Sequence, residues 1–171
     1  MKDTFLETVR LIVKYPTQDD FALIHELETD KEVMKYISDG SINSPERSQN
    51  KLKKDMAHFA KHHFGTGLVY EKATGEFVGQ AGLTFLEYND NQPEVELDYL
   101  LHKAHWGKGY ATELAKKSIE WGFKYLPLSK LIAVTDLKNQ GSQNVLTKAG
   151  LKYINELWCY NKTVKLFEIH K

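Results

Sequence analysis

A short glycine-rich loop that leads directly into an amphipathic helix constrains this chain more than any other feature of its sequence. The loop and the start of the helix read Trp106-Gly107-Lys108-Gly109-Tyr110-Ala111-Thr112-Glu113. Two glycines one residue apart let the backbone turn tightly and approach a ligand closely. Because we expect the helix to begin at about Tyr110, the amides of residues 108–112 have no acceptor within it. Free amides at the positive end of a helix dipole predict a site for phosphate or pyrophosphate, the alternative being a helix start without a ligand.

The segments on either side place this loop between two strands. Residues 94–101 alternate acidic and apolar side chains, which is typical of a strand with one polar face. After the loop, apolar residues recur at helical spacing until Pro127, and residues 131–135 form an apolar run typical of a buried strand. The sequence therefore predicts a strand, a phosphate loop, a helix and a second, parallel strand, joined by a right-handed crossover.

Three kinds of nucleotide-binding fold use such a unit. The phosphate loop of kinases and ATPases needs Ser or Thr after Gly-Lys, whereas Gly109 follows Lys108, so this fold is excluded. A dinucleotide-binding fold needs a third Gly or Ala where Thr112 stands, and an apolar first strand. Asp136, at the end of the following strand, could imitate its ribose-binding acid. A nicotinamide-dependent reductase that uses Gly107, Gly109 and Asp136 therefore stays an alternative.

The third kind of fold matches best, because the chain resembles the GNAT superfamily of N-acetyltransferases and, within it, the RimJ/RimL type. Residues 9–27 are similar to that family's opening strand and first helix, and residues 77–83 are similar to its central hairpin strand. Residues 99–113 match its acetyl-CoA loop, and residues 139–151 match its Asn-x-x-Ser helix and exit turn. These segments follow the family's order and spacing, so we expect residues 1–171 to form a single N-acetyltransferase domain.

The resemblance implies a mixed α/β fold, and the remaining segments agree with it. Ser44 is suited to cap a helix that starts at Pro45 and runs to about His63. Residues 73–75 form a turn between two hairpin strands, and residues after 150 read as a closing pair of strands. The expected order is β-α-α-β-β-β-α-β-α-β-β, in a mixed, mostly antiparallel central sheet with helices on both faces.

The resemblance also implies how acetyl-CoA, a co-substrate, is held. In that family one strand diverges from its parallel neighbour, and the pantetheine arm lies between them. A backbone amide near Leu100 or Leu101 would hold the thioester carbonyl, and Asn139 would contact the arm. The expected cofactor-binding residues are Tyr99, Leu100, Leu101, Trp106, Gly107, Lys108, Gly109, Tyr110, Ala111, Thr112, Asn139 and Ser142.

Acetyl transfer to an amine requires the amine to be neutral, and a base matters most for a lysine-like amine of pKa about 10.4. Glu96 stands where the family often has a strand glutamate, on the same face as Glu94 and Asp98. We expect Glu96 to be the catalytic base, with Asp98 as the second choice. The alternative is a strand face that is merely solvated.

The leaving thiolate needs a partner as well. The resemblance makes Ser142 the catalytic hydrogen-bond partner of the departing sulfur, whereas from the residues alone Asn139 and Ser142 could simply cap a helix. The general-acid tyrosine that is common in the superfamily falls at Leu146, which cannot donate a proton.

Composition and charge exclude other classes of protein. Lys and Arg total 23 against 23 Asp and Glu, which argues against a nucleic-acid partner. No apolar run approaches the roughly 20 residues of a membrane span, and the sequence does not begin like a signal peptide. Cys159 is the only cysteine, which fits a reducing compartment, so we expect a cytoplasmic location. Asp55, His58 and His62 have a spacing that could bind zinc, but no further ligand is evident and no metal is expected.

We therefore expect an acetyl-CoA-dependent N-acetyltransferase that moves the acetyl group directly to a primary amine in a ternary complex. The acceptor stays open among a protein N-terminus, a polyamine and another small amine, and a homodimer is one of the oligomeric states left open. A catalytically silent acyl-CoA-binding domain is the alternative from a different class.

Overall fold

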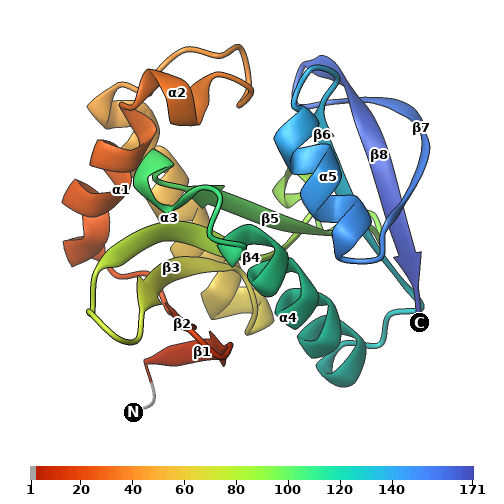
Figure 1. Cartoon of the computed structure of the whole chain (residues 1–171), viewed down its shortest axis with the longest axis horizontal. Helices are drawn as coiled ribbons and strands as arrows, with labels where there is room; N and C mark the ends of the chain where they lie inside the picture. Colours follow the sequence, from red (N-terminus) through yellow and green to blue (C-terminus); the bar gives the residue numbers. More distant parts are fainter. Residues whose placement is uncertain (1–2) are drawn as a thin grey trace.

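The computed structural model describes residues 3–171, whose strands form one mixed sheet (Figure 1). Within these residues the strand order is β1-β2-β3-β4-β5-β6-β8-β7, and only β5 and β6 pair in parallel. The expected mixed, mostly antiparallel sheet is confirmed. The strands are β1 (Thr4–Glu7), β2 (Leu11–Lys14), β3 (Thr66–Glu71), β4 (Phe77–Phe85), β5 (Val95–Leu101), β6 (Lys130–Asp136), β7 (Lys152–Cys159) and β8 (Lys162–His170).

Helices cover both faces of this sheet, as expected. The α-helices are α1 (Phe21–Glu28), α2 (Lys31–Met34), α3 (Pro45–His62), α4 (Tyr110–Tyr125) and α5 (Gln140–Lys148), and three 3₁₀ turns are η1 (Gln18–Asp20), η2 (Leu86–Tyr88) and η3 (Lys103–His105). Gly122 of α4 packs against Leu83 of β4, whereas Lys51 of α3 bonds Gln80 of the same strand. Because an odd and an even residue of one strand point to opposite faces, α4 and α3 lie on opposite sides of the sheet.

The apolar face of α4 packs into the core, as its amphipathic pattern predicted. Leu114, Ala115 and Ile119 are buried in one apolar cluster with Leu83 of β4 and Leu97 of β5. The helix begins at Tyr110 and ends at Tyr125, two residues before Pro127. No helix within residues 3–171 is both long and apolar enough to cross a membrane.

Two short elements were not predicted. The strand β1 precedes the expected first strand, and its apolar Phe5 and Leu6 are consecutive and both buried, so the segment lacks a two-residue alternation. The helix α2 has a single turn, which is too short for a helical period. It forms because the Asp30 side chain accepts hydrogen bonds from the amides of Glu32 and Val33.

Candidate active site

A slot opens between β5 and β6 at their carboxyl ends. The two strands share a single register pair, Glu96 with Ile132, and separate after it. On either side the sheet is continuous, since β5 pairs with β4 along its whole length and β6 does the same with β8. In the described sheet, β5 and β6 are the only neighbouring strands that share a single register pair, and the slot is the region where they separate.

The backbone of β5 turns alternate amides toward this slot. The amide of His102 donates to the carbonyl of Val78 in front of β4 over 2.9 Å, so even-numbered residues of β5 direct their backbone groups to β4. The N–H groups of Tyr99 and Leu101 consequently point away from β4, into the slot. The sequence predicted an amide near Leu100 or Leu101 as the donor to the thioester carbonyl. The amide of Leu101 points into the slot, whereas the amide of Leu100 faces β4.

The glycine-rich loop follows at the open end of β5. Gly107 and Gly109 have φ angles of 74° and 78°, a conformation that side chains with a Cβ rarely adopt. The first backbone hydrogen bond of the helix runs from the amide of Glu113 to the carbonyl of Gly109. Among residues 3–171, no acceptor is bound by the amides of residues 107–112. The loop thus presents a set of free N–H groups at a helix N-terminus.

Arg10, which the sequence did not single out, holds this loop in place. Its Nη1 donates to the carbonyl of Lys108 over 2.9 Å, and its Nε donates to the carboxylate of Glu113 over 2.7 Å. The guanidinium also lies over the ring of Tyr110, 4.5 Å from the ring centroid. A residue next to β2 therefore fixes both the loop and the first turn of α4, and no local pattern could have revealed it.

The aromatic residues of the loop make structural contacts. Trp106, which is 46% exposed, donates its ring N–H to the carbonyl of Leu101 over 2.9 Å. Tyr110 is buried and donates its hydroxyl to Glu71 at the end of β3. These two contacts anchor the loop to the sheet, so the backbone of the loop, more than its aromatic side chains, is free for a ligand.

The helix α5 borders the other side of the slot. Asn139 caps this helix, because its side chain accepts a hydrogen bond from the amide of Ser142. The hydroxyl of Ser142 in turn lies 2.9 Å from the hydroxyl of Tyr99. Leu146 is fully buried and apolar. The structure thus brings together Tyr99, Asn139 and Ser142, three of the predicted residues.

Glu96 lies at the closed end of the slot, and its burial excludes the alternative of a merely solvated strand face at this residue. Its side chain is only 5% exposed. Burial raises the pKa of Glu96 to about 8, against the opposing effect of the Tyr160 hydroxyl, which donates a hydrogen bond to Oε1, and with a further increase from nearby Asp98. A buried carboxyl that changes protonation near neutral pH is suited to exchange protons with a substrate.

The other two carboxylates of this segment, Asp98 of β5 and Glu94 just before it, have different surroundings. Asp98 accepts a hydrogen bond from the Thr66 hydroxyl over 2.6 Å, and burial raises its pKa to about 6 although Thr66 and Lys51 lower it. Glu94 forms an ion pair with Lys130 over 3.1 Å. The raised pKa values of Glu96 and Asp98 thus make these two residues better candidates for the catalytic base than Glu94.

A buried polar cluster of α3 extends the acidic surroundings of Asp98. Lys51 Nζ lies 2.8 Å from Asp55 and 3.9 Å from Glu28, and it donates to Gln80 over 3.2 Å. The side chains of Glu28, Asp55 and Gln80 are at most 1% exposed. Three buried polar side chains thus surround the ammonium group of Lys51.

The zinc spacing on α3 has a structural explanation. His58 uses both ring nitrogens within the protein, since Nδ1 lies 2.7 Å from the carbonyl of Phe64 and Nε2 accepts the amide of Phe85 over 3.1 Å. Asp55 accepts the Tyr88 hydroxyl in addition to Lys51. No group of three or more potential metal ligands occurs within residues 3–171.

Asp136 does not support the nicotinamide alternative. It forms an ion pair with Lys162 and accepts the amide of Lys138 over 2.8 Å, which lowers its pKa despite partial burial. The dinucleotide-binding fold also needs a largely parallel sheet, whereas one pair of described strands is parallel. The fold therefore overturns the reductase alternative.

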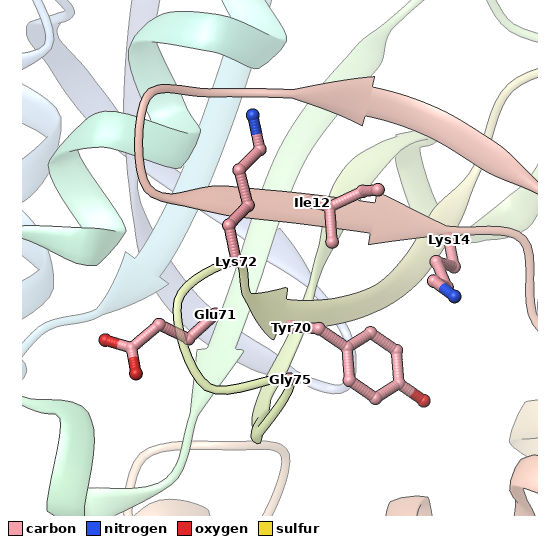
Figure 2. Close-up of a pocket in the computed structure, with 6 residues that line it drawn as sticks. All are labelled: Ile12, Lys14, Tyr70, Glu71, Lys72 and Gly75. Carbon is pink, nitrogen blue, oxygen red and sulfur yellow. The ribbon is translucent and has the colours of Figure 1, made fainter.

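A surface depression elsewhere contains none of the predicted residues. Figure 2 shows its lining residues, Ile12, Lys14, Tyr70, Glu71, Lys72 and Gly75. They belong to β2, to β3 and to the turn after β3, which β4 and β5 separate from the slot. The depression is thus distinct from the candidate site.

Sequence comparisons identify relatives over most of the chain. A family model described as the acetyltransferase (GNAT) domain matches residues 10–152. The chain is 28% identical over 151 residues to the uncharacterized protein YkkB of Bacillus subtilis, covering 88% of this chain and 86% of that protein. It is 24% identical over 140 residues to spermidine N(1)-acetyltransferase of Escherichia coli K12, covering 82% and 72% of the two chains.

Solved structures share the fold. An acetyltransferase from Agrobacterium tumefaciens C58 superposes with a TM-score of 0.83 at 23% identity, covering 97% of this chain and 94% of that one. RimL, a ribosomal L7/L12 alpha-N-protein acetyltransferase solved with coenzyme A, gives a TM-score of 0.80 at 10% identity, covering 98% and 97%. With the family model spanning residues 10–152, this chain belongs to the GNAT acetyltransferases and is an acyltransferase.

Proposed function

We propose that residues 1–171 form one catalytic domain that transfers the acetyl group of acetyl-CoA directly to a primary amine. The observation that carries the proposal is the arrangement of the slot. Free amides of residues 107–112 lie at its open end, and the buried carboxyl of Glu96 lies at its closed end. A cofactor held at one end thus presents its reacting atoms to a proton acceptor at the other.

The amides of residues 107–112 would bind the pyrophosphate, with the positive end of the α4 dipole favouring its charge. The pantetheine arm would then lie between β5 and β6, where Asn139 and Tyr99 border the slot. In this placement the N–H groups of Tyr99 and Leu101, which point into the slot, are the donors for the thioester carbonyl and the arm. An amide fixed in a strand stabilises the oxyanion of the tetrahedral intermediate without reorganising.

Glu96 would accept the proton of the attacking amine through a bridging water. The amine nitrogen forms a bond to the thioester carbon, the carbon–sulfur bond breaks, and coenzyme A leaves as a thiolate. The hydroxyl of Ser142, which is itself hydrogen-bonded to the hydroxyl of Tyr99, supplies a hydrogen bond to that sulfur. A neutral hydroxyl pair suffices, because a thiolate with a conjugate-acid pKa near 8.5 is a tolerable leaving group.

The acceptor that the charges favour is a cationic small amine such as a polyamine. Five carboxyl groups on α1, α3, η2 and β5 form a linked acidic group around Glu96 and Asp98, and Lys51 is a cation among them. These carboxyl groups belong to Glu28, Asp55, Glu87, Glu96 and Asp98. Such a field attracts a cation and concentrates it near the base. The relative from Escherichia coli acts on spermidine by name, which agrees with this choice.

A protein N-terminus is the second candidate acceptor, in line with the RimJ/RimL type. Trp106 opens the loop as in many members of that type, and the fold of RimL matches closely. An α-amine has a pKa of about 7.7–8.0 and needs a base less than a polyamine does. The pH dependence of the reaction therefore distinguishes the two acceptors.

A panel of amines tests the proposal. Purified protein with acetyl-CoA is given spermidine, spermine, an amino sugar, an amino acid or a peptide with a free N-terminus, and release of coenzyme A is followed together with the mass of the product. We expect acetylated polyamine as the main product. Acetyl-CoA binding in calorimetry without turnover of any amine would instead establish the silent acyl-CoA-binding domain.

A further inference from the structure

The turn between β7 and β8 carries Tyr160 to the closed end of the slot. Tyr160 and Asn161 both have positive φ angles, 52° and 57°, as a tight two-residue hairpin turn requires. Cys159 and Lys162 are paired across this turn. The geometry points the Tyr160 side chain at β5, where its hydroxyl donates to Oε1 of Glu96.

A second segment locks this turn. The backbone amide of Tyr160 donates to the Glu87 carboxylate over 2.7 Å, and the backbone amide of Glu87 donates to the Tyr160 hydroxyl over 3.0 Å. Glu87 and Tyr88 of η2 also have positive φ angles, 57° and 56°. Two non-glycine segments in this conformation thus meet through reciprocal hydrogen bonds, and the result is a fixed Tyr160 hydroxyl.

We infer that Tyr160 is a positioning residue for Glu96, holding one carboxylate oxygen so that the other is presented to the acceptor amine. The inference rests on the proposed function, in which Glu96 is the base. The Tyr160 hydroxyl accepts one hydrogen bond, from Glu87, and donates one, to Glu96. Its single proton is therefore committed to Glu96, and it favours the ionised form of that carboxyl.

Most titratable groups around Glu96 oppose its ionisation, so the hydrogen bond from Tyr160 has a large influence on its pKa. Glu87 of η2 and Asp98 of β5 are acidic, and both raise the pKa of Glu96. Cys159 at the end of β7 is buried, which raises its thiol pKa to about 12 and keeps it neutral. Lys51 and Asp55 of α3 lie beyond Asp98. The Tyr160 hydroxyl is thus the side-chain donor that counters burial and two carboxyl groups.

The experiment compares Tyr160→Phe with the unaltered protein across pH. Loss of a hydrogen bond to a charged group corresponds to a shift of about one pH unit, so the acidic limb of kcat/KM should move up by that amount. Activity at neutral pH should fall about tenfold and should recover at high pH, with acetyl-CoA affinity unchanged. A uniform loss at every pH would overturn the inference and indicate a structural role.

Two further variants sharpen this experiment. Tyr153→Phe is the matched control, because Tyr153 lies on β7, is 51% exposed, and makes no side-chain hydrogen bond within residues 3–171. It should leave the pH profile unchanged. In a Glu96→Gln background, Tyr160→Phe should cause no additional loss, because a residue that acts through Glu96 has no effect without it. An additive loss would contradict the inference.

Carboxyl carbon NMR gives a readout that does not need turnover. The titration of Glu96 is followed in the unaltered protein and in Tyr160→Phe, with Glu96→Gln assigning the resonance. A higher Glu96 pKa in Tyr160→Phe supports the inference even if no amine is acetylated, in which case only the proposed function fails. An unchanged Glu96 pKa would overturn the positioning role directly.

Discussion

The hydroxyl of Tyr99 lies 2.9 Å from the hydroxyl of Ser142, so side chains of β5 and α5 meet across the region where β5 and β6 separate. Burial raises the pKa of Tyr99 to about 12, although the bond to Ser142 opposes this. Tyr99 therefore keeps its proton at neutral pH and through the pKa of a lysine-like amine, about 10.4. Two protonated hydroxyls in series are suited to stabilise a sulfur anion.

Removing either hydroxyl should slow the chemical step. A hydrogen bond to a charged group is worth about 1.5–3 kcal/mol, so Ser142→Ala should lower kcat by about tenfold or more. Tyr99→Phe should have a smaller effect, since its hydroxyl acts through Ser142, and the double variant should be less than additive. Steady-state kinetics of coenzyme A release measure these changes, with Thr147→Val on α5 as the control. Full activity of Ser142→Ala would remove the hydroxyl pair from the mechanism.

The pH dependence should report the ionisation of Glu96. Only the ionised carboxylate of Glu96 accepts a proton, and its pKa is raised to about 8. The value of kcat/KM should therefore be low in acid and should increase as the pH rises through about 8. Glu96→Gln should lower kcat by about 10²-fold at neutral pH without weakening acetyl-CoA binding, and high pH should partly restore activity. Glu94→Gln, at the residue just before β5, should retain the normal profile. If Glu96→Gln is unimpaired at every pH, Asp98 becomes the candidate base.

The same ionisation should appear in the stability of the protein. The folded state binds the Glu96 proton more tightly than the unfolded chain does, since its pKa rises from 4.5 to about 8. The stability that this group contributes is fully present below the unfolded pKa and is lost as the pH rises through the folded pKa. Glu96→Gln, which cannot ionise, should therefore gain stability relative to the unaltered protein between about pH 5 and pH 8.5. Chemical denaturation at each pH measures the difference, and a difference that does not vary with pH would count against the raised pKa.

The loop makes a prediction that depends on backbone conformation. Gly109 has a φ of 78°, which a β-branched residue adopts only with strain, so Gly109→Val should distort the free amides. Acetyl-CoA binding should weaken at least about tenfold, or 1.4 kcal/mol, while the circular dichroism of the fold is retained. Lys108→Ala is the matched control and should matter less, because the amide of that residue makes the proposed contact. Calorimetry that finds equal affinities would exclude the loop from the cofactor site.

Local patterns in the sequence predicted the parts of this molecule that local forces determine. The start of α4 at Tyr110 and the Ser44 cap of α3 depend on residues within one helical turn, and both are present. The burial of Glu96 could not be read in the same way. It depends on Tyr160 and Glu87, which reach it only through the pairing of distant strands. Arg10 is a similar case, because its contact with Glu113 joins two residues that are 103 positions apart in the sequence.

Among residues 3–171, the pair of Glu96 with Ile132 is also the only register pair that joins the two halves of the sheet. Strands β1 to β5 form one continuous half, and β6, β8 and β7 form the other. Beyond this pair, the residues of β5 toward Leu101 have backbone partners in β4 alone. The proposed base therefore stands where its strand is held on both sides, next to a stretch that is held on one side only.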